Sequence, residues 1–195
     1  MRICRLINSG IVILVCFCSQ LGWTKSFPMP SSNTMIPHLP RVFEKNQGQV
    51  AQNFSYLAQT PETYFRFARD RVDLLLNTSS DGQFPNLLRI QFPDSTGNPD
   101  ITGLNRTRQY VNYLRGQASQ WIKQVATFKK IEYSNIFPGI DLQFYFTKTR
   151  MEFDFIVSPG ADPQQIAFEI KNADKIKINA TGALEIQLGK KKLFF

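Results

Sequence analysis

Two carboxylates are the best candidates for acid chemistry in this sequence. Glu152 and Asp154 alternate with apolar residues in the segment MEFDFIV, and on a β-strand such spacing places both side chains on one face, about 7 Å apart. Asp141, in a neighbouring apolar segment, could join them. Three clustered carboxylates could bind Ca²⁺, and a pair could serve a glycosidase. The simpler interpretation, which we prefer, is that alternation alone puts polar residues on the wet face of a strand.

Other residue types that support catalysis are scarce. The only histidine, His38, has no partner nearby, and the three cysteines, Cys4, Cys16 and Cys18, lie near the N-terminus. The sequence has no glycine-rich phosphate loop, no Gly-x-Ser-x-Gly motif and no histidine-based zinc pattern. We therefore assign no catalytic residue and no cofactor, and we expect the protein not to be an enzyme.

Aromatic residues offer a different function, which is stacking against sugar rings. The chain has 17 Phe and 6 Tyr, and Tyr110, Tyr113 and Trp121 fall within one polar stretch. They could bind a glycan, although core packing is the commoner use of aromatic side chains. The basic residues are spread along the sequence, which argues against a nucleic-acid partner.

Residues 1–22 have the layout of a secretory signal peptide. Arg2 and Arg5 precede the apolar run IVILVCFC at 11–18, and small or polar residues follow. This run is shorter than the roughly 20 residues of a membrane span, although an N-terminal anchor helix is the alternative. Cleavage would remove all three cysteines and two arginines, so that the net charge would fall from +8 to +6 and no disulfide could form.

The remaining chain divides into a proline-rich linker at 23–41 and a β-rich domain at 42–195. The linker contains Pro28, Pro30, Pro37 and Pro40, which favour extended conformations. The domain shows period-two alternation at 64–68 and 72–76, at 140–146 and 151–157, and at 176–178 and 184–188. Each pair predicts a hairpin. The sequence predicts an all-β, antiparallel β-sandwich-like domain with at most one or two short helical turns.

Helical signals are weak. Residues 117–130 could form a short helix, and a strand from Thr127 to Tyr133 is the alternative. Asp162 followed by Pro163 has the order of a helix cap and a first-turn proline, which predicts one turn.

Several phrases in the sequence are more specific than composition explains. They are FEKNQGQ at 43–49, NYLRG at 112–116, FPGIDL at 137–142, EFDFIV at 152–157 and PGADP at 159–163. In this order they resemble the N-terminal domain of bacterial secreted proteins that carry SBBP-type β-propeller repeats. Phe137 and Phe153 stand where that family usually has tyrosine. The residues that carry the resemblance are Asn46, Gly48, Gln49, Asn112, Tyr113, Gly116, Trp121, Pro138, Gly139, Asp141, Glu152, Asp154, Pro159, Gly160, Asp162 and Pro163.

The resemblance implies an extracellular, β-rich module of no established activity that is followed by repeats and adhesion-like domains. It transfers no catalytic residue. Its glycines suit turns that other residues disfavour, and its prolines and aspartates set turns. In that family the domain continues further, whereas this chain ends at Phe195 in the strand-like run GKKKLFF, so we expect a domain that is incomplete at its C-terminus.

The sequence thus favours a non-catalytic structural or interaction module at the cell surface, which would be part of a larger propeller-bearing or adhesin-like protein. Its partners would be other domains or surface molecules. The alternative is a glycan-binding or Ca²⁺-assisted binding module. A hydrolase that uses Glu152 and Asp154 is a distant third interpretation.

Overall fold

A computed structural model of the chain describes residues 41–61, 63–76, 86–93, 95, 99–148, 150–180, 182–189 and 191–194. The expected signal peptide, all of the linker before Arg41, His38 and the three cysteines lie outside the described residues. These expectations stay predictions.

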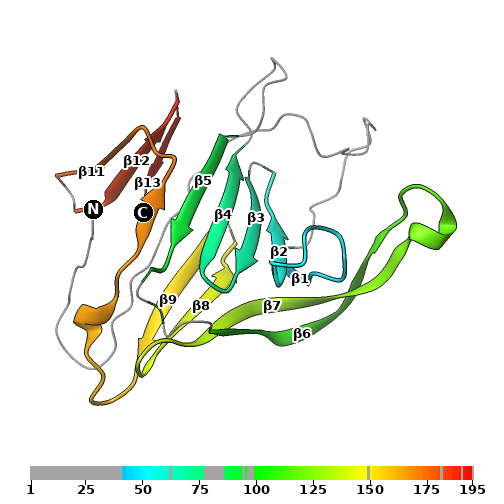
Figure 1. Cartoon of the computed structure of the whole chain (residues 1–195), viewed down its shortest axis with the longest axis horizontal. Coiled ribbons are helices and arrows are strands. Elements are labelled where there is room, and N and C mark those ends of the chain that lie inside the picture. Colours follow the sequence, from blue (N-terminus) through cyan, green and yellow to red (C-terminus); the bar gives the residue numbers. More distant parts are fainter. Residues whose placement is uncertain are drawn as a thin grey trace.

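The described residues form antiparallel strands and two short 3-10 turns, so the predicted all-β class is confirmed (Figure 1). The elements are β1 (Phe43–Lys45), β2 (Tyr56–Gln59), β3 (Thr63–Ala68), β4 (Arg71–Leu76), β5 (Asn86–Gln91), β6 (Asp100–Tyr113), η1 (Ala118–Gln120), β7 (Ile122–Phe137), β8 (Ile140–Phe146), β9 (Met151–Val157), η2 (Pro163–Gln165), β10 (Glu169–Lys171), β11 (Lys175–Ile178), β12 (Leu184–Leu188) and β13 (Lys191–Phe194).

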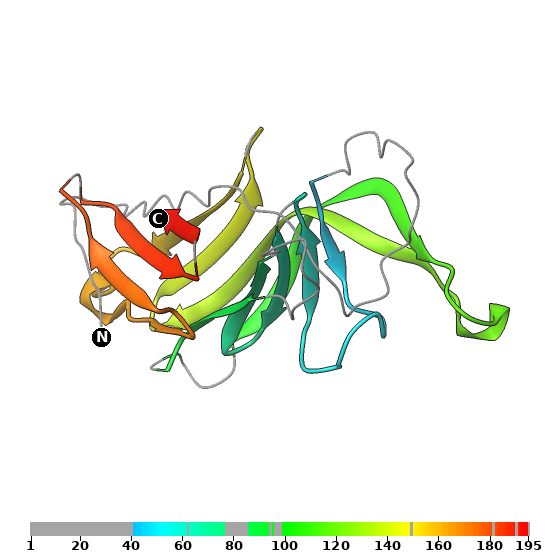
Figure 2. The same cartoon turned by 90° about the horizontal axis from the view of Figure 1, so that it is seen from above.

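The large sheet has the strand order β10-β5-β4-β3-β2-β1-β7-β8-β9, and β6 also pairs with β7. Because β6 pairs with β7 at both Phe128 and Ile131, it occupies one edge of that strand. β1 and β8 therefore share the opposite edge: β1 pairs at Phe128, and β8 pairs from Lys130 onward. The sheet divides at β7 and curls, which brings its two halves face to face (Figures 1 and 2).

Aromatic side chains fill the space between the two halves. Phe67 of β3 meets Phe144 of β8 with ring centroids 5.1 Å apart, and Phe43 of β1 packs on Phe67 at 5.5 Å. Tyr133 of β7 is fully buried, and its hydroxyl donates a hydrogen bond to the Ala68 carbonyl at 3.0 Å. Each aromatic pair adds about 0.5–1.5 kcal/mol beyond the area that it buries.

A second sheet, in the order β11-β12-β13, contains the C-terminal run. Ile186 of β12 and Leu193 of β13 are paired and fully buried, and both belong to the main hydrophobic cluster. On the same sheet, Glu185 is held between Lys177 at 3.2 Å and Lys192 at 2.9 Å. The strand-like character predicted for this run is thus realised in β13.

Beyond β1, the β6–β7 hairpin projects away from the rest of the molecule (Figures 1 and 2). We call residues 106–129 the arm. Of the two interpretations left open for residues 117–130, the strand is correct. Only the short η1 turn precedes it, and β7 begins at Ile122 and runs through the predicted strand from Thr127 to Tyr133.

The arm is irregularly paired. Arg106 lies opposite Phe128, but the next paired residue, Tyr110, lies opposite Ala126, so β6 contains a bulge. The buried Thr127 hydroxyl fills this bulge by donating to the Gln109 carbonyl at 2.9 Å. Such bulges twist a hairpin and make an exposed strand edge a poor template for further pairing.

Candidate functional site

The carboxylates singled out in the sequence lie on the outer face of the β8–β9 hairpin. Glu152 and Asp154 of β9 lie opposite Tyr145 and Gln143 of β8. Glu152 is 9% exposed and accepts a hydrogen bond from Arg150 Nε at 3.2 Å. Over the part of the chain that the structure describes, no group of three His, Cys, Asp or Glu side chains could hold a metal ion.

Asp141 has a separate task. Its Oδ1 accepts a hydrogen bond at 2.6 Å from the Asn135 backbone amide, in the turn between β7 and β8. Asn135 has a positive φ of 53°, and its own Oδ1 accepts from the Gly139 amide at 2.8 Å. Asp141 therefore orders a turn and does not join the other two carboxylates.

Tyr145 is the group that engages Glu152 and Asp154. Burial, together with hydrogen bonds to these two carboxylates, raises the pKa of Tyr145 to about 12. The Lys130 ammonium lies 5.1 Å from the centre of its ring. At neutral pH Tyr145 is thus a neutral donor to carboxylates. Arg150 and Tyr145 thus provide polar partners for the buried Glu152 carboxylate.

A further set of motif residues gathers where the β7–β8 turn meets the segment after β9. The Ser158 amide donates to the Gly139 carbonyl at 2.9 Å. Gly139 and Gly160 have φ angles of 71° and 84°, a region that favours glycine. Next to them Asp162 accepts from the Gln164 amide at 2.9 Å and caps η2, the turn that the sequence predicts there.

The motif at 46–49 builds a loop that approaches the arm at Ile122, next to the turn at its end. Asn46 Nδ2 donates to the carbonyls of Phe54 at 2.8 Å and Ala51 at 3.0 Å, and its Oδ1 accepts from the Gly48 amide at 3.1 Å. Gly48 has a φ of 111°, and a Cβ placed there would lie 3.7 Å from Cδ1 of Ile122, the first residue of β7. One asparagine thus ties the loop together where it meets the arm.

Tyr113 fastens the arm to β1. Its hydroxyl donates to Glu44 Oε2 at 2.6 Å. Burial raises the pKa of Glu44, although the Tyr113 hydrogen bond opposes this effect. Burial first, and then the charge of Glu44, raise the pKa of Tyr113 and that of Tyr64, the latter to about 12. Of the three aromatic residues considered for glycan stacking, Tyr113 is thus engaged within the fold.

The end of the arm is a compact turn built by its own residues. Gly116 has a φ of 68°, and the Gln117 amide donates to Gln120 Oε1 at 3.1 Å, which closes η1. The Trp121 indole donates to the Gly116 carbonyl at 3.4 Å. Further back, the Gln124 amide donates to Asn112 Oδ1 at 2.8 Å across the hairpin.

Large apolar side chains remain exposed along the arm. Tyr110 is 53% exposed, Leu114 is 57% exposed and Trp121 is 38% exposed. Outside the arm, the only large apolar side chains of the described residues that are exposed are Ile156 and Ile178. Exposed apolar groups that gather on one element often mark a contact surface.

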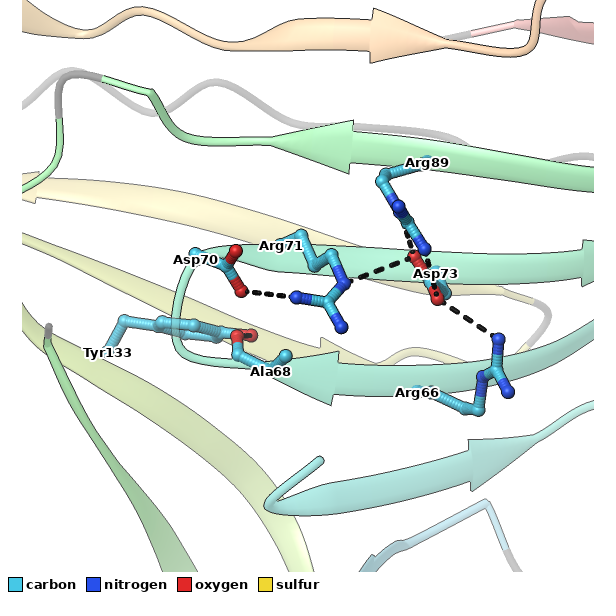
Figure 3. A network of polar contacts seen from close by, with 7 residues as sticks. All are labelled: Arg66, Ala68, Asp70, Arg71, Asp73, Arg89 and Tyr133. Carbon is cyan, nitrogen blue, oxygen red and sulfur yellow. Dashed lines mark hydrogen bonds and ion pairs between the residues drawn. The ribbon is translucent and has the colours of Figure 1, made fainter. Parts of the chain in front are cut away.

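A buried charge network lies on the outer face of β3, β4 and β5 (Figure 3). Asp73 is fully buried and faces Arg66 and Arg89 in register on the two neighbouring strands. Its carboxylate accepts from Arg89 Nε at 2.7 Å and from Arg66 at 3.0 Å, and Arg71 Nε lies at 3.8 Å. The Phe54 ring covers Arg66 at 4.6 Å.

This network was not anticipated from the sequence. Alternation places Arg71 and Asp73 on one face of β4, but only the strand register brings Arg66 and Arg89 to the same carboxylate. Their guanidinium groups are directed at Asp73, so the network has the character of a structural unit.

Among the described residues, no helix is both long enough and apolar enough to cross a membrane. No curated protein and no solved structure shows significant similarity to the chain. Residues 43–194, which include all the described strands and the arm, match the family described as a domain of unknown function, DUF7948. The chain therefore belongs to the DUF7948 family.

Proposed function

We propose that this chain is a non-catalytic extracellular or cell-surface interaction module and that the arm is its contact element. The observation that carries the proposal is the gathering of Tyr110, Leu114 and Trp121 in exposed positions on a projecting hairpin. Elsewhere the apolar side chains mostly fill the core. A monomeric fold gains nothing in stability from exposing them, whereas Tyr and Trp are enriched at interfaces.

The wider setting is part of the same proposal. The apolar run at 11–18 supports export. The motifs at 43–49, 112–116 and 137–163 support a relationship to bacterial proteins with SBBP-type repeats, in which this module would be the N-terminal part of a longer protein.

A second candidate, glycan binding, is supported by Tyr110 and Trp121. Both rings are accessible enough to stack on a sugar, while Tyr113 is engaged with Glu44. Assistance by Ca²⁺ has less support, because Asp141 orders a separate turn and Arg150 pairs with Glu152, so that the three carboxylates do not form one site.

The test compares binding of the labelled full chain to the surface of the cells that produce it. In the arm variant Tyr110→Ser/Leu114→Ser/Trp121→Ala, we expect at least a tenfold loss of affinity, because interface hot spots contribute about 2 kcal/mol or more each. Ile178→Ser is the matched control, since Ile178 is 53% exposed but lies on β11. Unchanged binding by the arm variant, with an unchanged circular dichroism spectrum, would contradict the proposal.

A further inference from the structure

The arm carries a charge pattern that sequence inspection did not isolate. Between residues 101 and 131 there is no Asp or Glu, whereas the chain as a whole has 15. The same stretch contains six basic residues, which are Arg106, Arg108, Arg115, Lys123, Lys129 and Lys130. Five of them belong to the arm, and all five are exposed. This charge is thus local in the sequence, and the hairpin carries it away from the rest of the molecule.

These five cations are not neutralised by acidic side chains of the described residues. Within residues 41–194, as far as the structure describes them, none of the five forms an ion pair with a carboxylate. In contrast, the arginines around Asp73 are all directed at a carboxylate. Unpaired cations on a surface without neighbouring acids create a positive potential that attracts anionic partners.

The cations lie beside the aromatic rings of the arm. Lys123 Nζ is 4.9 Å from the centre of the Trp121 ring, and the Arg106 guanidinium is 6.0 Å from that of Tyr110. Each pair offers an aromatic surface for an apolar or sugar face, with a cation next to it for a negative group.

The two cation–ring pairs lie at different positions along the length of the arm. Tyr110 lies opposite Ala126 in the middle of the arm, and Trp121 lies at its end. Arg106 lies opposite Phe128 and Tyr113 opposite Ile122, and at roughly 3.3 Å per residue along β7 the positive surface extends over about 20 Å. Beside the exposed Leu114 and Trp121, the turn contains the charged Arg115 and the polar Gln117, Ser119 and Gln120. Pushing that end into a bilayer would bury polar groups, so a partner that lies along the arm fits better than a membrane into which the tip inserts.

We propose that the arm binds a linear acidic polysaccharide. Its carboxylate or sulfate groups pair with the arm cations, and its sugar rings pack on Tyr110 and Trp121. This inference rests on the proposed function, because it names the partner of the same contact element. A single-stranded nucleic acid fits less well, since it needs closely spaced rings for successive bases, whereas Tyr110 lies opposite Ala126 in the middle of the arm and Trp121 lies at its end.

Trp121 makes binding measurable. The chain has two tryptophans, so the variant Trp23→Phe of the full chain leaves Trp121 as the only indole. We expect its emission to shift and saturate on titration with heparin, a sulfated polymer, or with polygalacturonate, a carboxylated one. Neutral dextran is expected to have no effect. Affinity should fall steeply between low and physiological salt, because ion pairs release counterions.

Matched charge variants locate the site. Arg108→Gln/Lys123→Gln/Lys129→Gln removes three arm cations, and Lys45→Gln/Lys148→Gln/Lys175→Gln removes three exposed lysines elsewhere. Both variants lower the net charge equally. We expect at least a tenfold loss of polysaccharide affinity in the arm variant and less than a threefold loss in the control. Equal losses in both would overturn the inference, because attraction by net charge would then explain the binding.

The remaining probes separate this inference from the proposed function. If only oligothymidylate or phosphatidylglycerol vesicles shift Trp121 emission, the polysaccharide assignment is wrong and the arm binds another anion. If no acidic polymer binds while Tyr110→Ser/Leu114→Ser/Trp121→Ala still abolishes cell-surface binding, the inference fails and the proposed function stands. If the aromatic variant also binds normally to the cell surface, both fail.

Discussion

The charge network around Asp73 makes a quantitative prediction about stability. Replacing Asp73 with Asn keeps the size of the side chain but removes its charge from the middle of three guanidinium groups. Arg89 donates to Asp73 through Nε at 2.7 Å and through a second nitrogen at 3.2 Å, and Arg66 donates at 3.0 Å. These bonds raise the pKa of Arg89, whereas burial is the largest effect on Arg66 and lowers its pKa.

The expected cost follows from burial. Asp73 is fully buried, and the side chains of Arg66 and Arg71 are each 17% exposed. Removing one partner of a buried ion pair costs about 3–5 kcal/mol, because the charges left behind cannot be rehydrated fully. The side chain of Arg89 is 34% exposed and can recover some hydration, so we expect the lower end, about 3 kcal/mol. In a chain of this size that lowers Tm by roughly 6–12 °C.

The assay is urea denaturation of the full chain followed by far-ultraviolet circular dichroism, with Asp70→Asn as the matched control. Asp70 pairs with Arg71 at 2.8 Å, but its side chain is 55% exposed, so its loss should cost about 1 kcal/mol or less. If Asp73→Asn also costs less than about 1 kcal/mol, the reasoning from buried charge is refuted.

Three further predictions concern other parts of the fold. In thermal denaturation, Gly139→Ala should cost about 2 kcal/mol or more and Gly160→Ala about 1 kcal/mol. Both glycines have a positive φ, but of the two only Gly139 would place a Cβ against another atom, at 2.8 Å. Equal costs would contradict the steric part of this argument. Tyr133→Phe should cost about 1–2 kcal/mol in urea, because it removes a buried hydrogen bond, and a neutral result would show that this bond does not stabilise the fold. Because the pKa of Glu44 is raised in the fold, its contribution to stability is fully present below its unfolded pKa and is lost as the pH rises through the folded pKa. Relative to Glu44→Gln, the wild-type chain should therefore be more stable at about pH 4 than at about pH 7, and a pH-independent difference would show that the pKa is not raised.

Much of the fold could be predicted from the sequence because several strands have one buried and one wet face. The alternation at 140–146 and 151–157 corresponds to β8 and β9, and that at 184–188 corresponds to β12. In such strands the hydrophobic period carries the structural information locally. The cap at Asp162 was likewise readable, because a cap and its turn are neighbours in sequence.

The β6 strand was missed for a related reason. It is half polar, contains bulges, and pairs almost entirely with β7, so its residues 105–110 show no clean alternation. Its conformation depends on a partner strand and on contacts such as those of Thr127 with Gln109. Signals of this kind lie in pairing and not in local pattern.

The candidate sites show the same division. The sequence identified Tyr110, Tyr113 and Trp121 as a set, but the fold separates them, since Tyr113 bonds to Glu44 while the other two are exposed. It also identified Glu152 and Asp154, yet the residue that engages both is Tyr145, which lies opposite Glu152 only because of the β8–β9 register.

By itself, the sequence determined that this is an all-β domain with an aromatic core and with motif residues set in turns, because each of these properties depends on residues close together along the chain. Only the tertiary structure decided which charges are engaged and which are free. Strand register brings Arg66 and Arg89 to Asp73, while the projection of the β6–β7 hairpin leaves five cations without a carboxylate partner among the described residues. Charge pairing depends on distance in space, and a curled sheet sets those distances between residues far apart in sequence.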